Sequence, residues 1–232
     1  MLLPVSRMDV LPWITGPVSG PVLFGVYAAS VAIVTAYAVG QYHLLWRYWR
    51  TPARPVPPVP SLTDRAWPSV TVQIPLYNER YVAAEIIDAC AALEYPPDRL
   101  ELQVLDDSTD DTREIVDARA AHWRARGITV TVFRRPTREG YKAGALAAAT
   151  PQATGDFLAL FDADFRPAPD FLRRCVPEFD AVDVGAVQAR WGHLNRGYSI
   201  LTLAQSLLHD AFFFVEQEAR ARSGYFTRFN GS

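Results

Sequence analysis

Residues 157–165 read Phe-Leu-Ala-Leu-Phe-Asp-Ala-Asp-Phe, an apolar run that ends in two carboxylates one residue apart. The run predicts a buried strand over 157–161. Because side chains alternate between the faces of a strand, we expect Asp162 and Asp164 to point the same way. Hard cations such as Mg²⁺ bind one or two carboxylates together with phosphate oxygens. The pair is therefore a candidate metal and phosphate site, and solvated turn acids are the alternative for so short a motif.

The composition excludes several classes of protein. Half of the 232 residues are hydrophobic and 12% are aromatic, which is enough for a packed core and too much for a disordered chain. The formal net charge is −2, so we expect no nucleic-acid partner. Cys90 and Cys175 have no metal-ligand spacing and are expected to be buried free thiols in helices, which fits a reducing compartment. The four histidines form no ligand pair.

The N-terminal region carries a membrane signal. Residues 21–45 contain no charged residue, and about 20 apolar residues suffice to cross a bilayer. We expect a short segment over 1–20 and a transmembrane helix over 21–46. A cleaved signal peptide fits poorly because the run is long, starts late and lacks a basic leader. A buried soluble helix is the other alternative. Three arginines follow the run: Arg47, Arg50 and Arg54. They place the following chain in the cytoplasm, on an inner or plasma membrane.

The rest of the chain predicts a linker and one α/β domain. Residues 47–68 include six prolines and suggest an extended, semi-rigid linker. In the predicted domain, 69–232, strand and helix patterns alternate, which predicts a mostly parallel sheet with helices on both faces. The strands are expected over 70–75, 100–105, 128–133, 157–161 and 185–189, and the helices over 81–93, 112–126, 142–149 and 171–179.

Polar residues follow several predicted strands, and ligands of parallel sheets bind at the carboxyl ends of the strands. Glu79 could accept a hydrogen bond from a base or ribose, or could be a first-turn helix acid. Asp106 and Asp107 could bind a nucleobase or ribose hydroxyl, or form a turn with Ser108–Asp111. Asp111 and Glu114 have the spacing of a capping box.

Two further segments are candidates for ligand contacts. Lys142 opens an Ala-rich helix, where a cation and a helix N-terminus suit a diphosphate. No Walker or Gly-x-Gly-x-x-Gly pattern occurs, so neither a P-loop nucleotidase nor a dinucleotide fold is indicated. The segment Gln188-Ala189-Arg190-Trp191 could line a carbohydrate site, and a packed tryptophan is the alternative. Residues 201–216 are apolar and aromatic, as in a core or a membrane-facing surface.

These motifs together resemble the family 2 glycosyltransferases, in their processive, membrane-bound branch of cellulose synthase-like and glucomannan synthase-like enzymes. The resemblance covers about residues 68–232. The motifs occur here in the family's order: Ile74-Pro75-Leu76-Tyr77-Asn78-Glu79, Leu105-Asp106-Asp107-Ser108-Thr109-Asp110, Lys142-Ala143-Gly144-Ala145-Leu146, Asp162-Ala163-Asp164, Gln188-Ala189-Arg190-Trp191 and Phe229-Asn230-Gly231.

The resemblance implies a GT-A fold, which is Rossmann-like, and an inverting transfer from GDP-mannose or UDP-glucose that extends a β-linked glycan. It also implies roles for individual residues. Among the donor-binding residues, Tyr77, Glu79 and Asp107 would contact the nucleoside, with Asp106 close by, and Lys142 would lie near the base or diphosphate. Asp162 and Asp164 would hold the diphosphate and Mg²⁺ or Mn²⁺. The sugar or acceptor would be lined by Gln188, Arg190, Trp191 and Asn230.

The sequence departs from the family at its end. The family places its catalytic base after the Phe-Asn-Gly element, and this sequence stops at Ser232, directly after that element. We therefore expect a C-terminally truncated fragment that binds the donor but does not polymerise, because the general base that deprotonates the acceptor lies downstream. A single-transfer enzyme acting on a lipid or polyprenyl phosphate is one alternative. A non-catalytic, membrane-anchored nucleotide-sugar-binding module is the other.

Overall fold

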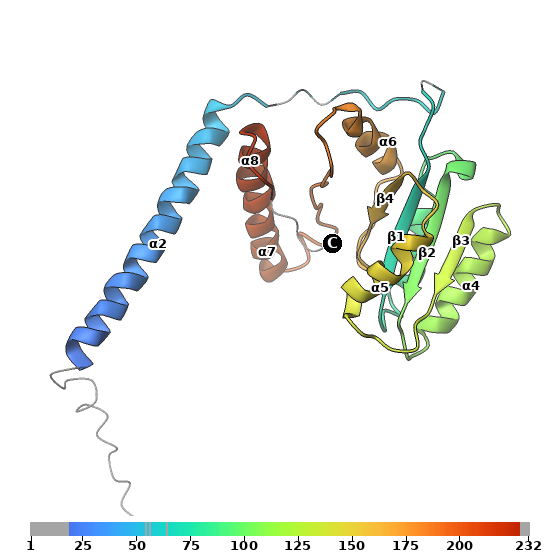
Figure 1. Ribbon diagram of the computed structural model, residues 1–232, viewed down its shortest axis with the longest axis horizontal. Coiled ribbons are helices and arrows are strands. Elements are labelled where there is room, and N and C mark those ends of the chain that lie inside the picture. Colours follow the sequence, from blue (N-terminus) through green and yellow to red (C-terminus); the bar gives the residue numbers. More distant parts are fainter. Residues whose placement is uncertain (1–18, 54, 56, 64, 228–232) are drawn as a thin grey trace, which may run out of the picture. The chain divides into compact units, whose positions relative to one another are not determined.

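The computed structural model describes residues 19–227 except 54, 56 and 64, and it divides the chain into two compact units (Figure 1). Of the described residues, one unit combines 19–55 with 190–227, and the other contains 57–189. We call the first the N-terminal unit and the second the α/β unit. The division falls inside the predicted 69–232 domain, and residues 190–227 group with the N-terminal segment.

The α/β unit contains a parallel sheet of four strands in the order β3-β2-β1-β4 (Figure 1). The first four predicted strands and the α/β fold class are thereby confirmed. Val70 of β1 lies opposite Leu100 of β2 and Phe157 of β4. The strands are β1 (Val70–Leu76), β2 (Leu100–Asp106), β3 (Thr129–Phe133) and β4 (Phe157–Leu160).

The predicted fifth strand is wrong. Residues 185–189 form neither strand nor helix. The sequence Gly-Ala-Val-Gln-Ala is apolar, but glycine and alanine are poor strand formers, and a strand also needs a neighbour that takes its hydrogen bonds. Among the described residues, β4 is therefore an edge of the sheet.

Helices cover both faces of the sheet. Leu102 and Val104 of β2 pack in a core with Ile86, Ile87 and the buried Cys90 of α3 and with Val116 of α4. On the opposite face, Leu105 packs with Ala145 and Ala149 of α5. The helices are α3 (Ala83–Ala91), α4 (Thr112–Arg124), α5 (Tyr141–Ala149) and α6 (Phe171–Cys175), with short 3₁₀ turns η1 (Pro97–Arg99), η2 (Thr150–Gln152) and η3 (Val176–Asp180).

Three local expectations need correction. The helix predicted over 171–179 stops at Cys175 and continues as η3, because Pro177 removes a backbone donor and clashes with an α-helical turn. Cys175 is only partly buried, unlike Cys90. Asp111 makes no capping bond, because its backbone is already helical; instead Asp110 Oδ1 accepts from the backbone N–H of Thr112 at 3.1 Å.

A buried polar network fixes the register of β1 against β2. Gln73 Nε2 donates to Gln103 Oε1 at 2.8 Å, and these residues are register partners. Two residues along each strand, Thr71 Oγ1 donates to Glu101 at 2.6 Å, and Glu101 also accepts from the backbone and hydroxyl of Thr154. Buried polar groups stabilise a fold only when they are hydrogen-bonded, so this face tolerates no shift in register.

The N-terminal unit is helical. The helix α2 (Ser19–Arg50) is the one helix of the described residues that is long and apolar enough to cross a membrane. Its last turns contact the C-terminal helices of the same unit, where Arg47 Nε donates to Ser223 Oγ at 3.0 Å and Arg222 Nη1 donates to the carbonyl of Thr51 at 3.1 Å. Those helices are α7 (Ile200–Asp210), the π-helix η4 (Ala211–Gln217) and α8 (Glu218–Arg222).

Candidate active site

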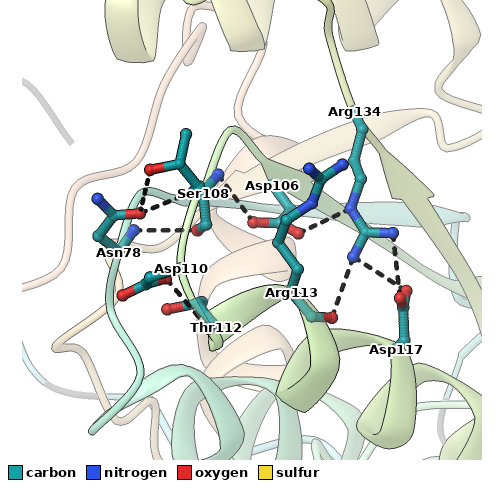
Figure 2. Close-up of polar contacts among 9 residues, drawn as sticks. Asn78, Asp106, Ser108, Asp110, Thr112, Arg113, Asp117 and Arg134 are labelled. Atoms are coloured by element: carbon teal, nitrogen blue, oxygen red, sulfur yellow. Dashed lines mark hydrogen bonds and ion pairs between the residues drawn. The ribbon is translucent and has the colours of Figure 1, made fainter.

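The loops after β1 and β2 are tied to each other. Asn78 has φ 56°, a left-handed conformation that asparagine tolerates better than most residues. Its side-chain oxygen accepts from the backbone N–H of Thr109 at 2.9 Å, and its own N–H donates to Ser108 Oγ at 3.0 Å (Figure 2). Strained backbone of this kind is kept where surrounding contacts hold it, often at functional sites. Here it brings the residues that follow both strands together.

The neighbouring carboxylates Asp106 and Asp107 have different surroundings. The Asp106 side chain is fully buried and accepts from Arg134 Nε at 2.9 Å and from the backbone of Ser108 at 3.1 Å. Arg134 also bonds Asp117 and the carbonyl of Arg113 (Figure 2). Asp106 therefore holds the strand end in shape, whereas Asp107 reaches a cleft on the other side.

A cleft of about 350 Å³ lies at the carboxyl ends of β1, β2 and β4. It brings together six of the residues expected to bind donor or metal: Tyr77, Glu79, Asp107, Lys142, Asp162 and Asp164. Arg138 and five smaller or apolar residues complete the lining: Pro75, Leu76, Leu105, Ala145 and Ala163. Asp106 is not part of this lining.

The Asp-x-Asp pair lies in a turn and not on the strand. β4 ends at Leu160, and the N–H of Phe165 donates to the carbonyl of Asp162 at 3.0 Å. The alternation of strand side chains therefore does not set the direction of the two carboxylates, although both line the cleft. Asp162 forms an ion pair with Lys142, and Asp164 is exposed.

Lys142 follows a tightly turned backbone at the start of α5. Gly140 and Tyr141 both have positive φ, at 68° and 50°. The helix begins at Tyr141, so Lys142 lies in its first turn, where the unpaired N–H groups and the helix dipole favour an anion.

Sequence reasoning missed the arginines that follow β3. Arg135 binds both carboxylate oxygens of Asp107, with Nε 3.1 Å from Oδ1 and Nη2 on Oδ2. This hydrogen bond raises the pKa of Arg135 further above its ordinary value, against the opposing effect of burial, so the guanidinium stays charged. The Arg138 guanidinium lies 3.4 Å from the ring centre of Tyr77. The rule that ligands bind at strand ends applies to the predicted strand 128–133 as well and could have identified both arginines.

Of the candidates for the sugar or acceptor, Gln188 is not part of this lining, and Arg190 and Trp191 are described within their own unit. Gln188 belongs to the α/β unit, whereas Arg190 and Trp191 belong to the N-terminal unit. Arg190 lies 4.0 Å from the ring centre of Phe214, and Trp191 packs against His209 and Phe213. Asn230 lies outside the described residues.

The donor set of the cleft fits a hard divalent cation only in part. No group of three His, Cys, Asp or Glu side chains able to hold a metal occurs in the described parts of the chain. Asp162 and Asp164 supply carboxylate oxygens alone, which suits Mg²⁺ or Mn²⁺ when phosphate oxygens and water complete the coordination. The residues present therefore fit a metal that is shared with a phosphate ligand.

A parallel α/β sheet with carboxylates, a lysine and a helix N-terminus in one strand-end cleft has the groups that suit a phosphorylated ligand. Comparison with known proteins makes this specific. Residues 71–226 match the family model described as Glycosyl transferase family 2, and the chain belongs to that family.

The curated relatives include plant enzymes. Glucomannan 4-beta-mannosyltransferase 1 of Oryza sativa subsp. japonica is 42% identical over 178 residues, which cover 75% of this chain and 34% of the relative. Glucomannan 4-beta-mannosyltransferase 2 of Arabidopsis thaliana is 38% identical over 195 residues, covering 80% and 36%. The chain thus spans about a third of the length of the curated relatives it matches.

A solved structure is also similar. The mannosyltransferase PcManGT from Pyrobaculum calidifontis, in complex with GDP-Man and Mn²⁺, matches with a TM-score of 0.56 and 34% sequence identity. The match covers 68% of this chain and 45% of that chain. The likeness in fold agrees with the expected GT-A fold.

Proposed function

We propose that this chain is the donor-binding part of an inverting glycosyltransferase that extends a β-linked glycan from GDP-mannose. The observation that carries the proposal is the cleft that gathers Tyr77, Glu79, Asp107, Lys142, Asp162 and Asp164. The plant relatives are mannosyltransferases by name, and the similar solved structure holds GDP-Man, so both favour GDP-mannose over UDP-glucose. We assign only donor binding to this chain, because it spans about a third of the length of these relatives, and we leave the transfer to a glycan acceptor to a protein of their full length.

Each side of the cleft has its own chemistry. On one side, Tyr77 offers a ring face, and Glu79 and Asp107 offer acceptors for the N–H and O–H groups of a nucleoside. On the other side, Lys142 and the first turn of α5 offer positive charge to a diphosphate. Asp162 and Asp164 would hold Mg²⁺ or Mn²⁺ beside it. When bound, the metal would neutralise charge on the departing nucleoside diphosphate.

The ion pair between Lys142 and Asp162 places a positive charge beside the two carboxylates. A lysine close to one member of the carboxylate pair reduces the repulsion that the two carboxylates would otherwise feel. The same ammonium is a donor within reach of a diphosphate that approaches this pair. Asp164, exposed, is the member of the pair that is more open to a cation from solvent.

Titration calorimetry on the full chain in detergent tests the proposal. We expect GDP-mannose to bind in the presence of Mn²⁺ and to bind at least about tenfold more weakly after its removal by a chelator, because the diphosphate and the two carboxylates would then repel each other. Asp164→Asn should weaken binding by a similar factor. The control Asp98→Asn changes an exposed aspartate of η1 outside the cleft and should leave the affinity unchanged.

Two results would overturn parts of this assignment. Equal affinity of the wild type and Asp164→Asn would remove the metal role of Asp164. Tighter binding of UDP-glucose than of GDP-mannose would overturn the choice of donor while leaving a nucleotide-sugar site in place.

A further inference from the structure

Arg135 connects three parts of the cleft wall. Its guanidinium donates to both oxygens of Asp107, to the carbonyl of Glu139 at 2.8 Å and to the carbonyl of Tyr141 at 3.0 Å. Asp107 follows β2, Arg135 follows β3, and the two carbonyls belong to the turn that starts α5. The side chain itself does not line the cleft, so its contacts are with the protein.

The backbone around Arg135 is shaped to receive a guanidinium. Gly140 and Tyr141 are left-handed in succession, and the carbonyls of Glu139 and Tyr141 both reach the same side chain. A left-handed tyrosine is unfavourable and persists only when other contacts hold it. A Cβ on Gly144 would lie 2.0 Å from the Glu139 carbonyl oxygen and 2.7 Å from Arg135 Nη1. Residue 144 therefore has to lack a side chain for this arrangement to form.

The same turn carries two cationic side chains that line the cleft. Arg138 lies over the ring of Tyr77, and Lys142 pairs with Asp162. The Arg135 and Asp107 side chains are only 16% and 7% exposed, so water screens their pairing weakly. The planar Arg135 guanidinium, which donates to four acceptor oxygens, can move less than a lysine ammonium could at the same place.

We propose that Arg135 is a positioning residue that fixes the spacing between Asp107, on the nucleoside side of the cleft, and Lys142, on its diphosphate side. The inference rests on the proposed donor binding and adds to it a residue that touches no ligand. A nucleoside diphosphate has a fixed separation between its base and its phosphates. It gains from both contacts only when the two protein groups are held at the matching distance.

A double-mutant cycle on the full chain separates positioning from a merely structural role. The affinity for GDP-mannose with Mn²⁺ is measured for the wild type, Arg135→Ala, Lys142→Ala and the double variant. Each single change should weaken binding about tenfold, but Lys142→Ala should cost less than about threefold once Arg135 is gone, because Lys142 is then no longer held in place.

The matched control is Arg65→Ala, which removes another arginine–aspartate fork of the same unit. Arg65 bonds Asp180 with Nη1–Oδ2 and Nη2–Oδ1 at 2.7 and 2.9 Å, away from the cleft lining. In that background Lys142→Ala should keep its full effect. Arg135→Lys keeps the charge but cannot span four acceptors, so it should behave like Arg135→Ala in the cycle and serves in its place if the alanine variant does not fold.

Hydrogen–deuterium exchange without any ligand provides the second readout. Amides of residues 138–146 should exchange faster in Arg135→Ala and Arg135→Lys than in the wild type or Arg65→Ala, with β1 and β2 unchanged. Additive effects in the cycle, or unchanged exchange over 138–146, would overturn the positioning role. A wild type that binds no nucleotide sugar but shows the expected exchange would overturn the proposed function and leave the positioning of this turn standing.

Discussion

At the end of β2, two adjacent carboxylates, Asp106 and Asp107, have different surroundings and therefore different roles. Leu105 and Phe133 are register partners, so the residues that follow continue side by side: Asp106 pairs with Arg134 and Asp107 with Arg135. Because successive side chains alternate in direction, Asp106 is buried against Arg134, whereas Asp107 lines the cleft. The sequence places both aspartates at a strand end, but which one reaches the cleft depends on the neighbouring strand.

The Glu101 carboxylate gives a prediction about pH. Burial opposes its ionisation, but hydrogen bonds from Thr71, Thr154 and Gln103 outweigh that effect and hold its pKa below the ordinary value of 4.5. The folded state therefore binds protons less readily than the unfolded state. The contribution of Glu101 to stability should be complete above about pH 4.5 and should be lost as the pH falls from there through the lower folded pKa.

Thermal unfolding followed by circular dichroism at a series of acidic pH values checks this. In Glu101→Gln the decline in Tm below about pH 4.5 should be shallower than in the wild type, and stability near neutral pH should be lower by about 1–3 kcal/mol from the lost charged acceptor. Glu114→Gln, on the exposed surface of α4, should keep the wild-type decline. Parallel declines in the wild type and Glu101→Gln would show that another group controls acid stability.

At the scale of the elements, β4 can lie beside β1 only because residue 155 has no side chain. A Cβ on Gly155 would lie 2.4 Å from the backbone nitrogen of Thr71 and 2.8 Å from the carbonyl carbon of Val70. Gly155→Ala should push the edge strand away and destabilise the protein by about 1–3 kcal/mol, as overpacked sites do. Gly185→Ala adds a methyl group in open space and should stay within about 0.5 kcal/mol of the wild type. Urea unfolding midpoints check both, and equal midpoints would contradict the close contact.

The elements also show what the sequence can and cannot predict. Four strands are predictable because each is an apolar run of strand length between turn residues. Residues 185–189 show the limit, since an apolar run becomes a strand only if a neighbour takes its hydrogen bonds. The rule that ligands bind at the carboxyl ends of parallel strands identifies most of the cleft residues, because the end of each strand can be read from the sequence. The left-handed turn at Gly140 and Tyr141, and the link through Arg135, follow from three-dimensional contacts that no local pattern encodes.

At the scale of the whole molecule, α2 is long enough to cross a membrane with its first part and to contact the rest of its own unit with its last turns. The 31 helical residues Gly20–Arg50 would extend about 46 Å, longer than the hydrocarbon core of about 30 Å. The first part exposes large apolar side chains such as Phe24 and Ile33. The last turns instead contact residues near α8, through Arg47 and through His43, whose Nε2 lies 3.3 Å from Tyr225 Oη. We expect the first part to lie in lipid and the last turns to emerge from it.

The charges after the apolar span predict on which side of the membrane the α/β unit lies. Arg47 and Arg50 lie in the last turn of α2, and arginines beside a span favour the cytoplasmic face. In sealed vesicles with the cytoplasmic face outward, added protease should digest the α/β unit and leave α2 as a protected fragment. In vesicles of the opposite orientation the α/β unit should survive. Digestion in both preparations, together with release of the chain by alkaline carbonate, would show that α2 does not cross the bilayer; protection only in the first preparation would reverse the orientation.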